Sequence, residues 1–134
     1  MSSQAPAART PGAVRAGDGQ YLFDLAKVNK IKGGPDYSSV EGGCVEGDKM
    51  IVALMRMPAG TGAEAHSHPN EQWIYVLEGT FKGKVGDKEF EARAGSVVYV
   101  PSNVVHSGKA TPDGDVVFFT CKDTSHSLHG IKAA

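Results

Sequence analysis

Two histidines stand one residue apart in the stretch GTGAEAHSHPNEQWIYVLEG, which covers residues 60–79. Side chains alternate across a β-strand, so His66 and His68 would face the same side of a strand that contains both. Imidazole nitrogens bind zinc, copper, iron, nickel and manganese to different degrees. The pair therefore predicts two ligands of one metal ion, and such a site needs further ligands from elsewhere in the chain.

A third histidine lies in the run GSVVYVPSNVVHSG, residues 95–108. The residues before Pro101 are typical of a strand, and the proline favours a turn after it. A strand that returns from this turn would bring His106 back beside His66 and His68. We therefore expect three imidazoles from two separate segments to meet at one ion.

The fourth ligand is a choice between a carboxylate and an amide that stand side by side. Glu71 is the better ligand by charge, whereas Gln72 shares the even parity of the histidine pair once the chain re-enters a strand. We expect Gln72 to bind through its amide oxygen and Glu71 to point away from the site. Coordination by Glu71, or a site of three histidines without a fourth side chain, is the alternative.

The two stretches resemble the paired motifs of the cupin superfamily. The first motif, G-x5-HxH-x3/4-E-x6-G, aligns with Gly60, His66, His68, Gln72 and Gly79. The second motif, G-x5-PxG-x2-H-x3-N, aligns with Gly95, Pro101, Asn103 and His106. The resemblance implies an all-β fold, the double-stranded β-helix or jelly-roll barrel, with one divalent transition metal (Fe, Mn, Ni, Zn or Co) at its centre. It does not select a reaction, because one fold hosts many chemistries.

The sequence departs from the family motifs at three positions. Asn103 replaces a glycine, and asparagine tolerates a positive φ better than most other residues, so the turn can form. Ala110 takes the last asparagine slot of the second motif. Gln72 replaces the usual glutamate, so no ligand neutralises the divalent ion. Such an ion is a stronger Lewis acid towards a bound oxygen.

The ligand order His-His-Gln-His resembles that of small cupins that act as lyases or isomerases, such as the sugar-ring-opening protein of pectin breakdown and the cupin hydroxynitrile lyases. We therefore expect a metal-dependent lyase or isomerase whose substrate is a small polar hydroxy or carbonyl compound. A non-haem Fe(II) dioxygenase and a non-catalytic sugar or metabolite binder are the alternatives. The C-terminal residues lack the acidic and arginine-bearing tail of the ring-opening family, so its substrate is not carried over.

Three further residues are candidates for a catalytic role. Arg56 lies in a strand with two equally apolar faces, so it is either a surface cation or an inward partner of a substrate carboxylate. Tyr99 either packs in the barrel or donates a hydrogen bond in the pocket. His126 lies in the C-terminal tail, which could cover the barrel mouth and supply a general base. Lys122 and Asp123 are candidates for the pocket rim.

Short runs rich in Val, Ile, Phe and Tyr lie between the glycines after residue 40, and such runs predict strands. The predicted strands cover residues 50–57, 65–69, 71–77, 80–85, 88–92, 96–100, 104–109 and 115–122. They favour an antiparallel sandwich or barrel. The sequences EGT and VGDKEF indicate hairpin turns. Residues 21–33 are either a short helix or an edge strand.

The composition is that of a soluble globular protein of one domain. The chain has 134 residues and a formal net charge of −1, with charges of both signs mixed along it. No basic run favours nucleic acid. No apolar run approaches the roughly 18 residues of a membrane span, and the N-terminus does not resemble a secretory signal. We therefore expect a cytoplasmic protein with no nucleic-acid or membrane partner.

Residues 1–18 are rich in Ala, Pro, Ser and Gly, so we expect a flexible N-terminal arm. Residues 19–134 would form a single cupin barrel domain, with motif one at 60–79 and motif two at 95–110. Trp73 and Tyr75 have the opposite parity to Gln72, so we expect them on the outer face. An outward aromatic pair favours an interface, and we expect a homodimer. The two cysteines, Cys44 and Cys121, indicate reduced thiols rather than a disulfide framework.

Overall fold

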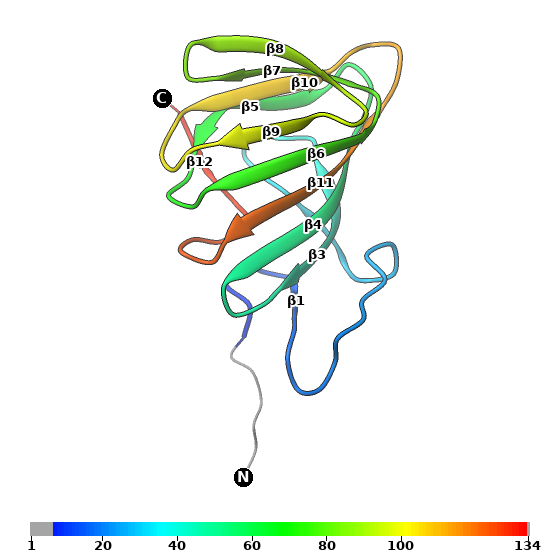
Figure 1. The fold of residues 1–134 in the computed structure, drawn as a ribbon, viewed down its shortest axis with the longest axis vertical. Coiled ribbons are helices and arrows are strands. Elements are labelled where there is room, and N and C mark those ends of the chain that lie inside the picture. The colour runs from blue at the N-terminus through cyan, green and yellow to red at the C-terminus, as the bar shows by residue number, and fades with distance from the viewer. Residues whose placement is uncertain (1–6, 134) are drawn as a thin grey trace.

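The computed structural model describes residues 7–133, which form two β-sheets packed face to face (Figure 1). The strands are β1 (Val14–Arg15), β2 (Lys30–Lys32), β3 (Glu41–Glu46), β4 (Met50–Met57), β5 (Gly62–Ser67), β6 (Gln72–Glu78), β7 (Thr80–Val85), β8 (Lys88–Arg93), β9 (Val97–Val100), β10 (His106–Ala110), β11 (Val116–Asp123) and β12 (Ile131–Lys132). Residues 7–133 contain no helix, and so no helix among them is long and apolar enough to cross a membrane.

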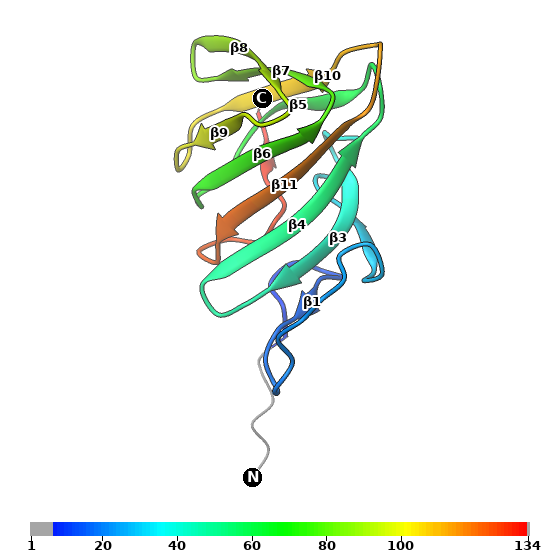
Figure 2. The ribbon, with the colours of Figure 1, turned by 45° about the vertical axis from the view of Figure 1, so that its right-hand side comes forward.

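The chain passes back and forth between the two sheets. One sheet has the strand order β1-β3-β4-β11-β6-β9, with β2 also paired to β3, and the other has the order β12-β5-β10-β7-β8 (Figure 2). Every strand pair is antiparallel except β1 with β3. The result is the predicted jelly-roll barrel, in which segments distant in the sequence become neighbours.

Alternation along the strands places one row of side chains between the sheets. In β4, Ile51, Ala53, Met55 and Met57 are buried, while the intervening residues are more exposed. The central strand β11 follows the same rule, with every second residue buried from its first position. Burying a large apolar side chain contributes about 1.5–3 kcal/mol, so these facing rows hold the two sheets together. Polar residues that occupy positions in the same rows must therefore also point inward.

All eight predicted strands are present, and β4 and β7 have the predicted bounds. The strand β3 was not predicted, because two glycines interrupt its sequence. Those glycines allow close pairing: a Cβ at Gly42 would lie 1.9 Å from the carbonyl oxygen of Leu54. Within residues 21–33 no helix forms, and the edge-strand alternative is confirmed at β2, which pairs with β3.

One of the two predicted hairpins is wrong. The VGDKEF turn connects β7 to β8, which pair directly from Val85 to Lys88. The EGT sequence instead forms a corner between sheets, because β6 and β7 belong to different sheets. Gly79 makes this corner with a φ of 82°, and a Cβ there would approach the carbonyl oxygen of Asp115 to 2.2 Å.

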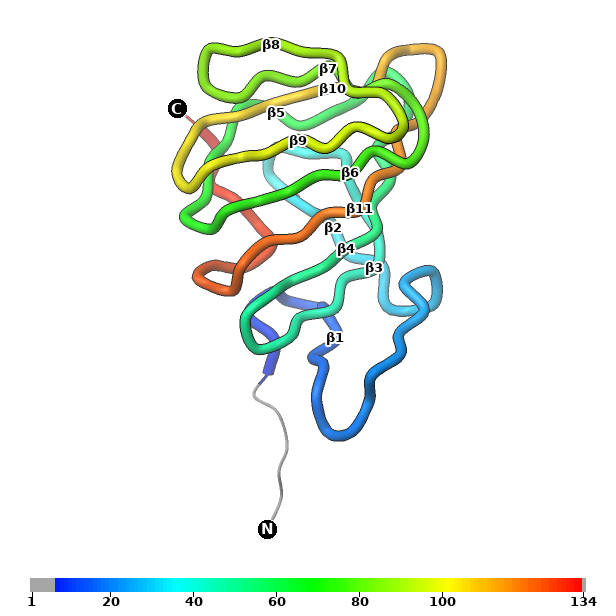
Figure 3. The backbone as a smooth tube through the Cα atoms, viewed as in Figure 1, coloured from blue at the N-terminus to red at the C-terminus, as the bar shows by residue number. Residues whose placement is uncertain are grey.

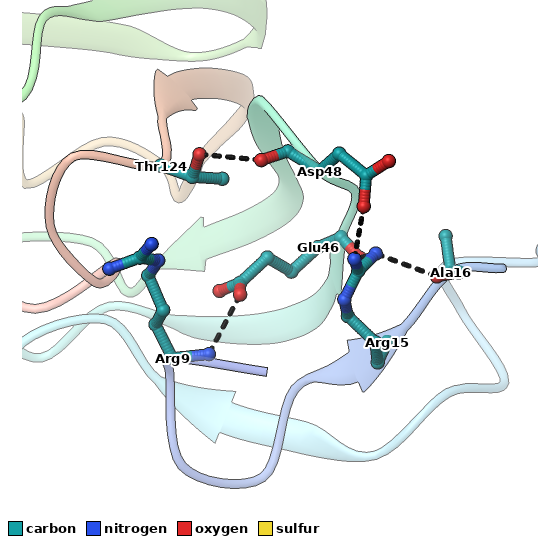
Figure 4. Close-up of polar contacts among 6 residues, drawn as sticks. All are labelled: Arg9, Arg15, Ala16, Glu46, Asp48 and Thr124. Carbon is teal, nitrogen blue, oxygen red and sulfur yellow. Dashed lines mark hydrogen bonds and ion pairs between the residues drawn. The ribbon is translucent and has the colours of Figure 1, made fainter. Parts of the chain in front are cut away.

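Of the N-terminal arm expected at residues 1–18, residues 9–18 contact the larger sheet; residues 1–6 lie outside the described part of the chain. The backbone amide of Arg9 donates to the buried Glu46 carboxylate at 2.7 Å (Figure 4). Arg15 forms an ion pair with Asp48 and donates to the carbonyl of Ala16 at 2.7 Å. These contacts, together with the β1–β3 pairing, fix the segment along the edge of the larger sheet.

Candidate metal centre

The three histidines and Gln72 converge from both sheets. His66 on β5 and His106 on β10 are direct partners in the antiparallel ladder, so their side chains lie next to each other on the inner face. His68 follows β5, and Gln72 begins β6 in the opposite sheet. The nearest ring nitrogens of the three histidines all lie within 4.8 Å of one another. The site therefore lies between the sheets, where the sequence-based prediction placed it.

Backbone hydrogen bonds fix the orientation of each imidazole. The Nδ1 atom of His66 lies 2.7 Å from the carbonyl oxygen of Glu64, and that of His106 lies 2.9 Å from the carbonyl oxygen of Val104. The Nδ1 atom of His68 lies 2.8 Å from the carbonyl oxygen of the residue two positions later. A carbonyl can only accept, so Nδ1 carries the proton in each ring. This leaves three Nε2 lone pairs free to bind a cation.

The histidines are neutral near pH 7. Burial, together with the neighbouring His106, lowers the pKa of His66 to about 3. Burial is also the main reason that the pKa of His68 and that of His106 are lowered to about 4. Only the neutral imidazole can donate a lone pair, so burial keeps all three rings in the form that binds metal.

Thr120 determines which end of the Gln72 amide faces the histidines. The Thr120 hydroxyl donates to the carbonyl oxygen of Trp73 at 2.8 Å. It therefore accepts from the Gln72 Nε2 group at 2.9 Å. This directs the Gln72 Oε1 atom towards His68, whose Nε2 lies 3.0 Å away.

Lone pairs face each other in the centre of the cluster. The Nε2 atoms of His68 and His106 are 3.2 Å apart, and the Oε1 atom of Gln72 lies 3.0 Å from the same His68 atom. The one proton of each neutral ring is on Nδ1, where it is donated to a backbone carbonyl. A hydrogen bond among these three atoms would therefore need a second proton on a buried ring, which would give that ring a positive charge. A cation between them removes the repulsion. Three imidazoles and an amide oxygen suit a divalent transition metal, so the residues present fit a metal ion.

The turn of the second motif holds the two ligand segments together. Asn103 adopts a φ of 64°, which confirms that it can replace the motif glycine. Its backbone amide donates to the carbonyl oxygen of His68 at 2.8 Å. This bond ties the turn before His106 to the end of the first histidine pair.

Replacing Gln72 tests the fourth ligand. Gln72→Ala should lower metal affinity at least about 100-fold, more than the loss of a group that only orients a ligand, because one oxygen donor is lost. Gln72→Glu should retain the metal, since a carboxylate is a good ligand, but should change activity because it adds a negative charge. Competition with a chelating dye measures the affinities. The exposed Gln20→Ala serves as the matched control, and an unchanged affinity in Gln72→Ala would exclude Gln72 as a ligand.

A small cavity adjoins the candidate metal centre. It has a volume of about 70 Å³, and His66, Gln72 and His106 form part of its wall. Apolar side chains from both sheets form most of the remaining wall, and Lys122 is also part of it. The arrangement would leave one side of a bound ion facing a largely apolar space that a ligand of few atoms can occupy.

Three residues of this cavity were not identified by motif or strand parity. The Tyr37 ring stacks on His66 with centroids 4.1 Å apart, and its hydroxyl accepts from the Gly130 backbone amide at 2.8 Å. Leu128 lines the cavity from the C-terminal tail, which crosses from β11 to pair with β5 (Figure 3). Lys122, expected only at the rim, lies inside. Tyr37 and Leu128 lie in loops, where parity carries no information.

The structure places the three predicted catalytic residues away from the cavity. Arg56 lies on the outer face of β4, mostly exposed, and forms a 3.0 Å ion pair with Asp115. Tyr99 lies on the outer face of β9, 40 % exposed, and its hydroxyl donates to Glu71. His126 does not line the cavity; its carbonyl accepts from Asn70 at 3.3 Å. The inward roles predicted for Arg56 and Tyr99 are therefore wrong, and the geometry does not support His126 as a base.

The remaining orientations agree with strand parity. Glu71 is exposed and points away from the histidines, towards Tyr99. Trp73 and Tyr75 are 47 % and 43 % exposed on the outer face of β6. Cys44 and Cys121 are both free thiols.

The structure is a jelly-roll barrel with a three-histidine cluster between its sheets that could hold a metal ion. Residues 53–122 match the Cupin domain family. This match covers more than half of the chain, so the protein belongs to the cupin family. None of the curated protein sequences compared with the chain matches it.

Solved structures share the fold at low sequence identity. A cupin-2 domain protein of Rhodospirillum rubrum is 15 % identical with a TM-score of 0.70, covering 86 % of this chain and 81 % of that one. KdgF from a Halomonas species is 15 % identical with a TM-score of 0.66, covering 78 % and 93 %. A predicted oxalate decarboxylase of Thermotoga maritima is 19 % identical with a TM-score of 0.66, covering 77 % and 98 %.

Proposed function

We propose that the protein is a metal-dependent enzyme, a lyase or isomerase, whose substrate is a small hydroxy or carbonyl compound. The observation that carries this proposal is the convergence of four neutral donors, His66, His68, His106 and Gln72, beside a small and largely apolar cavity. A divalent ion bound there supplies Lewis-acid chemistry: it polarises a ligand oxygen and stabilises negative charge that develops on it.

The chain's own residues prepare the site for this chemistry. Thr120 holds the Gln72 amide oxygen towards the site, and Tyr37 packs against the His66 ring. No side chain among these ligands carries a negative charge, so the charge of the ion stays available to the substrate. Much of the cavity wall is apolar, and charge interactions are stronger where the dielectric constant is low.

The proposal is tested by deuterium exchange next to a carbonyl group. Purified protein is loaded separately with Fe²⁺, Mn²⁺, Co²⁺, Ni²⁺ or Zn²⁺ and incubated in D₂O with small 2-hydroxy and 2-oxo compounds. We expect metal-dependent exchange or product formation by NMR, with no oxygen consumption. His106→Ala serves as the inactive control.

Two results would contradict the proposal. Oxygen uptake that requires Fe²⁺ would favour a dioxygenase in its place. Tight binding of a small molecule that never exchanges or reacts would favour a binding protein. Elemental analysis of protein purified without added metal accompanies both measurements, since a chain that holds no metal under any loading condition would exclude all metal-dependent activities.

We propose that the protein forms a homodimer through the outer face of β6 and β9. Trp73, Tyr75, Leu77, Val97 and Tyr99 lie on these paired strands and are each between 40 % and 56 % exposed. The Trp73 and Tyr99 rings are in contact, with centroids 4.7 Å apart. This apolar patch resembles the core of an association surface.

Trp73→Lys should convert the dimer to a monomer, because a central aromatic residue can contribute 2 kcal/mol or more, about 30-fold in affinity. Size-exclusion chromatography with light scattering measures the mass. Tyr21→Lys, at a 92 % exposed position outside the strands, is the matched control. A wild-type protein that is monomeric, or a Trp73→Lys variant that stays dimeric, would contradict this interface.

A further inference from the structure

One cation lies inside the metal-site cavity. Lys122 is the only lysine or arginine among residues 7–133 that lines this cavity, and it is 4 % exposed. It belongs to the inward row of β11, two positions after Thr120, and its Cα is paired with that of Gln72 on β6. Paired residues of antiparallel strands project to the same face. The lysine side chain therefore lies on the same side of the sheet as the Gln72 amide.

No negative side chain accompanies Lys122. Its Nζ group donates to the backbone carbonyl of Leu128. In the described part of the chain, no Asp or Glu oxygen lies within 4.0 Å of this Nζ group, and neither residue type lines the cavity. A buried ammonium group without a counter-charge is strongly unfavourable. Consistent with this, burial lowers the pKa of Lys122 to about 7.

A divalent ion in the candidate metal centre would add a second unbalanced positive charge beside the same cavity. Its four donors are neutral, so a divalent ion bound by them would keep its full charge. Two positive centres would then face one small volume enclosed largely by apolar side chains. An anionic ligand between them would offset part of both charges, whereas a neutral ligand would offset neither.

The cavity volume limits the size of such an anion. One water needs roughly 10–15 Å³ on this scale, and the cavity measures about 70 Å³. It therefore has room for a ligand of a few heavy atoms, the size of a two- or three-carbon acid rather than a sugar.

We propose that Lys122 is a specificity-determining residue that binds the carboxylate of a small 2-hydroxy or 2-oxo acid. The hydroxy or oxo oxygen of that acid then faces the site formed by His66, His106 and Gln72. This inference rests on the proposed function and narrows its substrate class to small carboxylic acids.

The test compares two ligands of similar size and different charge. Pyruvate is an anion, and hydroxyacetone is its uncharged analogue with a hydroxymethyl group in place of the carboxylate. Isothermal titration is carried out with the zinc-loaded wild type, with Lys122→Met, and with Lys109→Met as a matched exposed control. We expect the wild type to prefer pyruvate. Lys122→Met should lose pyruvate affinity by about 30-fold or more and change hydroxyacetone affinity little.

The outcomes separate this inference from the proposed function. Zinc content and thermal unfolding are measured on the same samples. A wild type that retains zinc but binds both ligands equally overturns the carboxylate assignment, as does unchanged pyruvate binding in folded Lys122→Met. If Lys122→Met does not fold, Lys122→Gln, which keeps a long polar side chain without the charge, takes its place. A wild type that retains no zinc or other divalent metal overturns the proposed function itself.

Discussion

Replacing His106 with alanine should abolish metal retention. The Nε2 atom of His106 lies 3.2 Å from that of His68, and His106 is the one histidine ligand supplied by the second motif. Loss of a group that merely orients a ligand lowers metal affinity about 10–100-fold, so loss of a ligand should lower it at least about 100-fold. Elemental analysis after dialysis, and dye competition for the affinity, measure the effect.

Loss of metal through unfolding must be separated from loss of a ligand. His106 is 7 % exposed and begins β10, which pairs with both β5 and β7. His106→Gln keeps most of the side-chain volume and tests whether packing alone matters. His129→Ala is the matched control, because its Nε2 atom contacts the carbonyl of Lys32 outside the site. Unchanged metal content in folded His106→Ala would rule out His106 as a ligand and remove the basis of the proposed function.

The strands that carry the site could be predicted because the short apolar runs, and the glycines between them, are local features of the sequence. The β4 bounds followed from an apolar run that only Arg56 interrupts and that ends before Pro58. The β3 strand has no such run, and its glycines are explained only by the carbonyl of Leu54 on the neighbouring strand. The contacts of the N-terminal segment could not be predicted from the sequence either. They depend on the buried Glu46, which accepts hydrogen bonds from Arg9 and Thr10.

Strand parity was sufficient for the metal ligands and insufficient for the rest of the cavity. Counting positions along the two strands placed His66 and Gln72 on the inner face and Glu71 on the outer face. Counting fails where both faces of a strand are apolar, as at Arg56, because the inward face is then chosen by the opposing sheet. Counting also fails at Tyr99. The alternation within its strand could be read from the sequence, but the sequence did not show how that strand is aligned with the strands that carry the ligands.

The free energy of unfolding of the metal-free protein should fall as the pH is lowered from about 6.5 to about 4. The pKa of His66 is lowered to about 3, and that of His68 and of His106 to about 4, mainly by burial. In the unfolded chain these groups bind protons below about pH 6.5. The unfolded state therefore binds more protons throughout this window, and stability decreases with falling pH.

The size of this effect follows from the number of groups. Each histidine contributes up to about 1.4 kcal/mol per pH unit, so three give about 4 kcal/mol per unit at most. The pKa values of Asp115 and Asp123 lie below the ordinary 3.8, so these carboxyls add a smaller effect of the same sign near the acid end of the window. Lys122, with its pKa of about 7, is largely protonated in both states below pH 6.

Urea unfolding of the chelator-treated protein at several pH values measures the slope. His106→Gln removes one of the three titrating rings, so it should reduce the slope by about one third. Added Zn²⁺ should raise stability at pH 7 and lose this effect as the pH falls, because protons then compete with the metal for the same Nε2 lone pairs. A stability that stays constant between pH 6.5 and 4 would mean that the three rings are not neutral and buried together, and the geometry of the whole site would then be wrong.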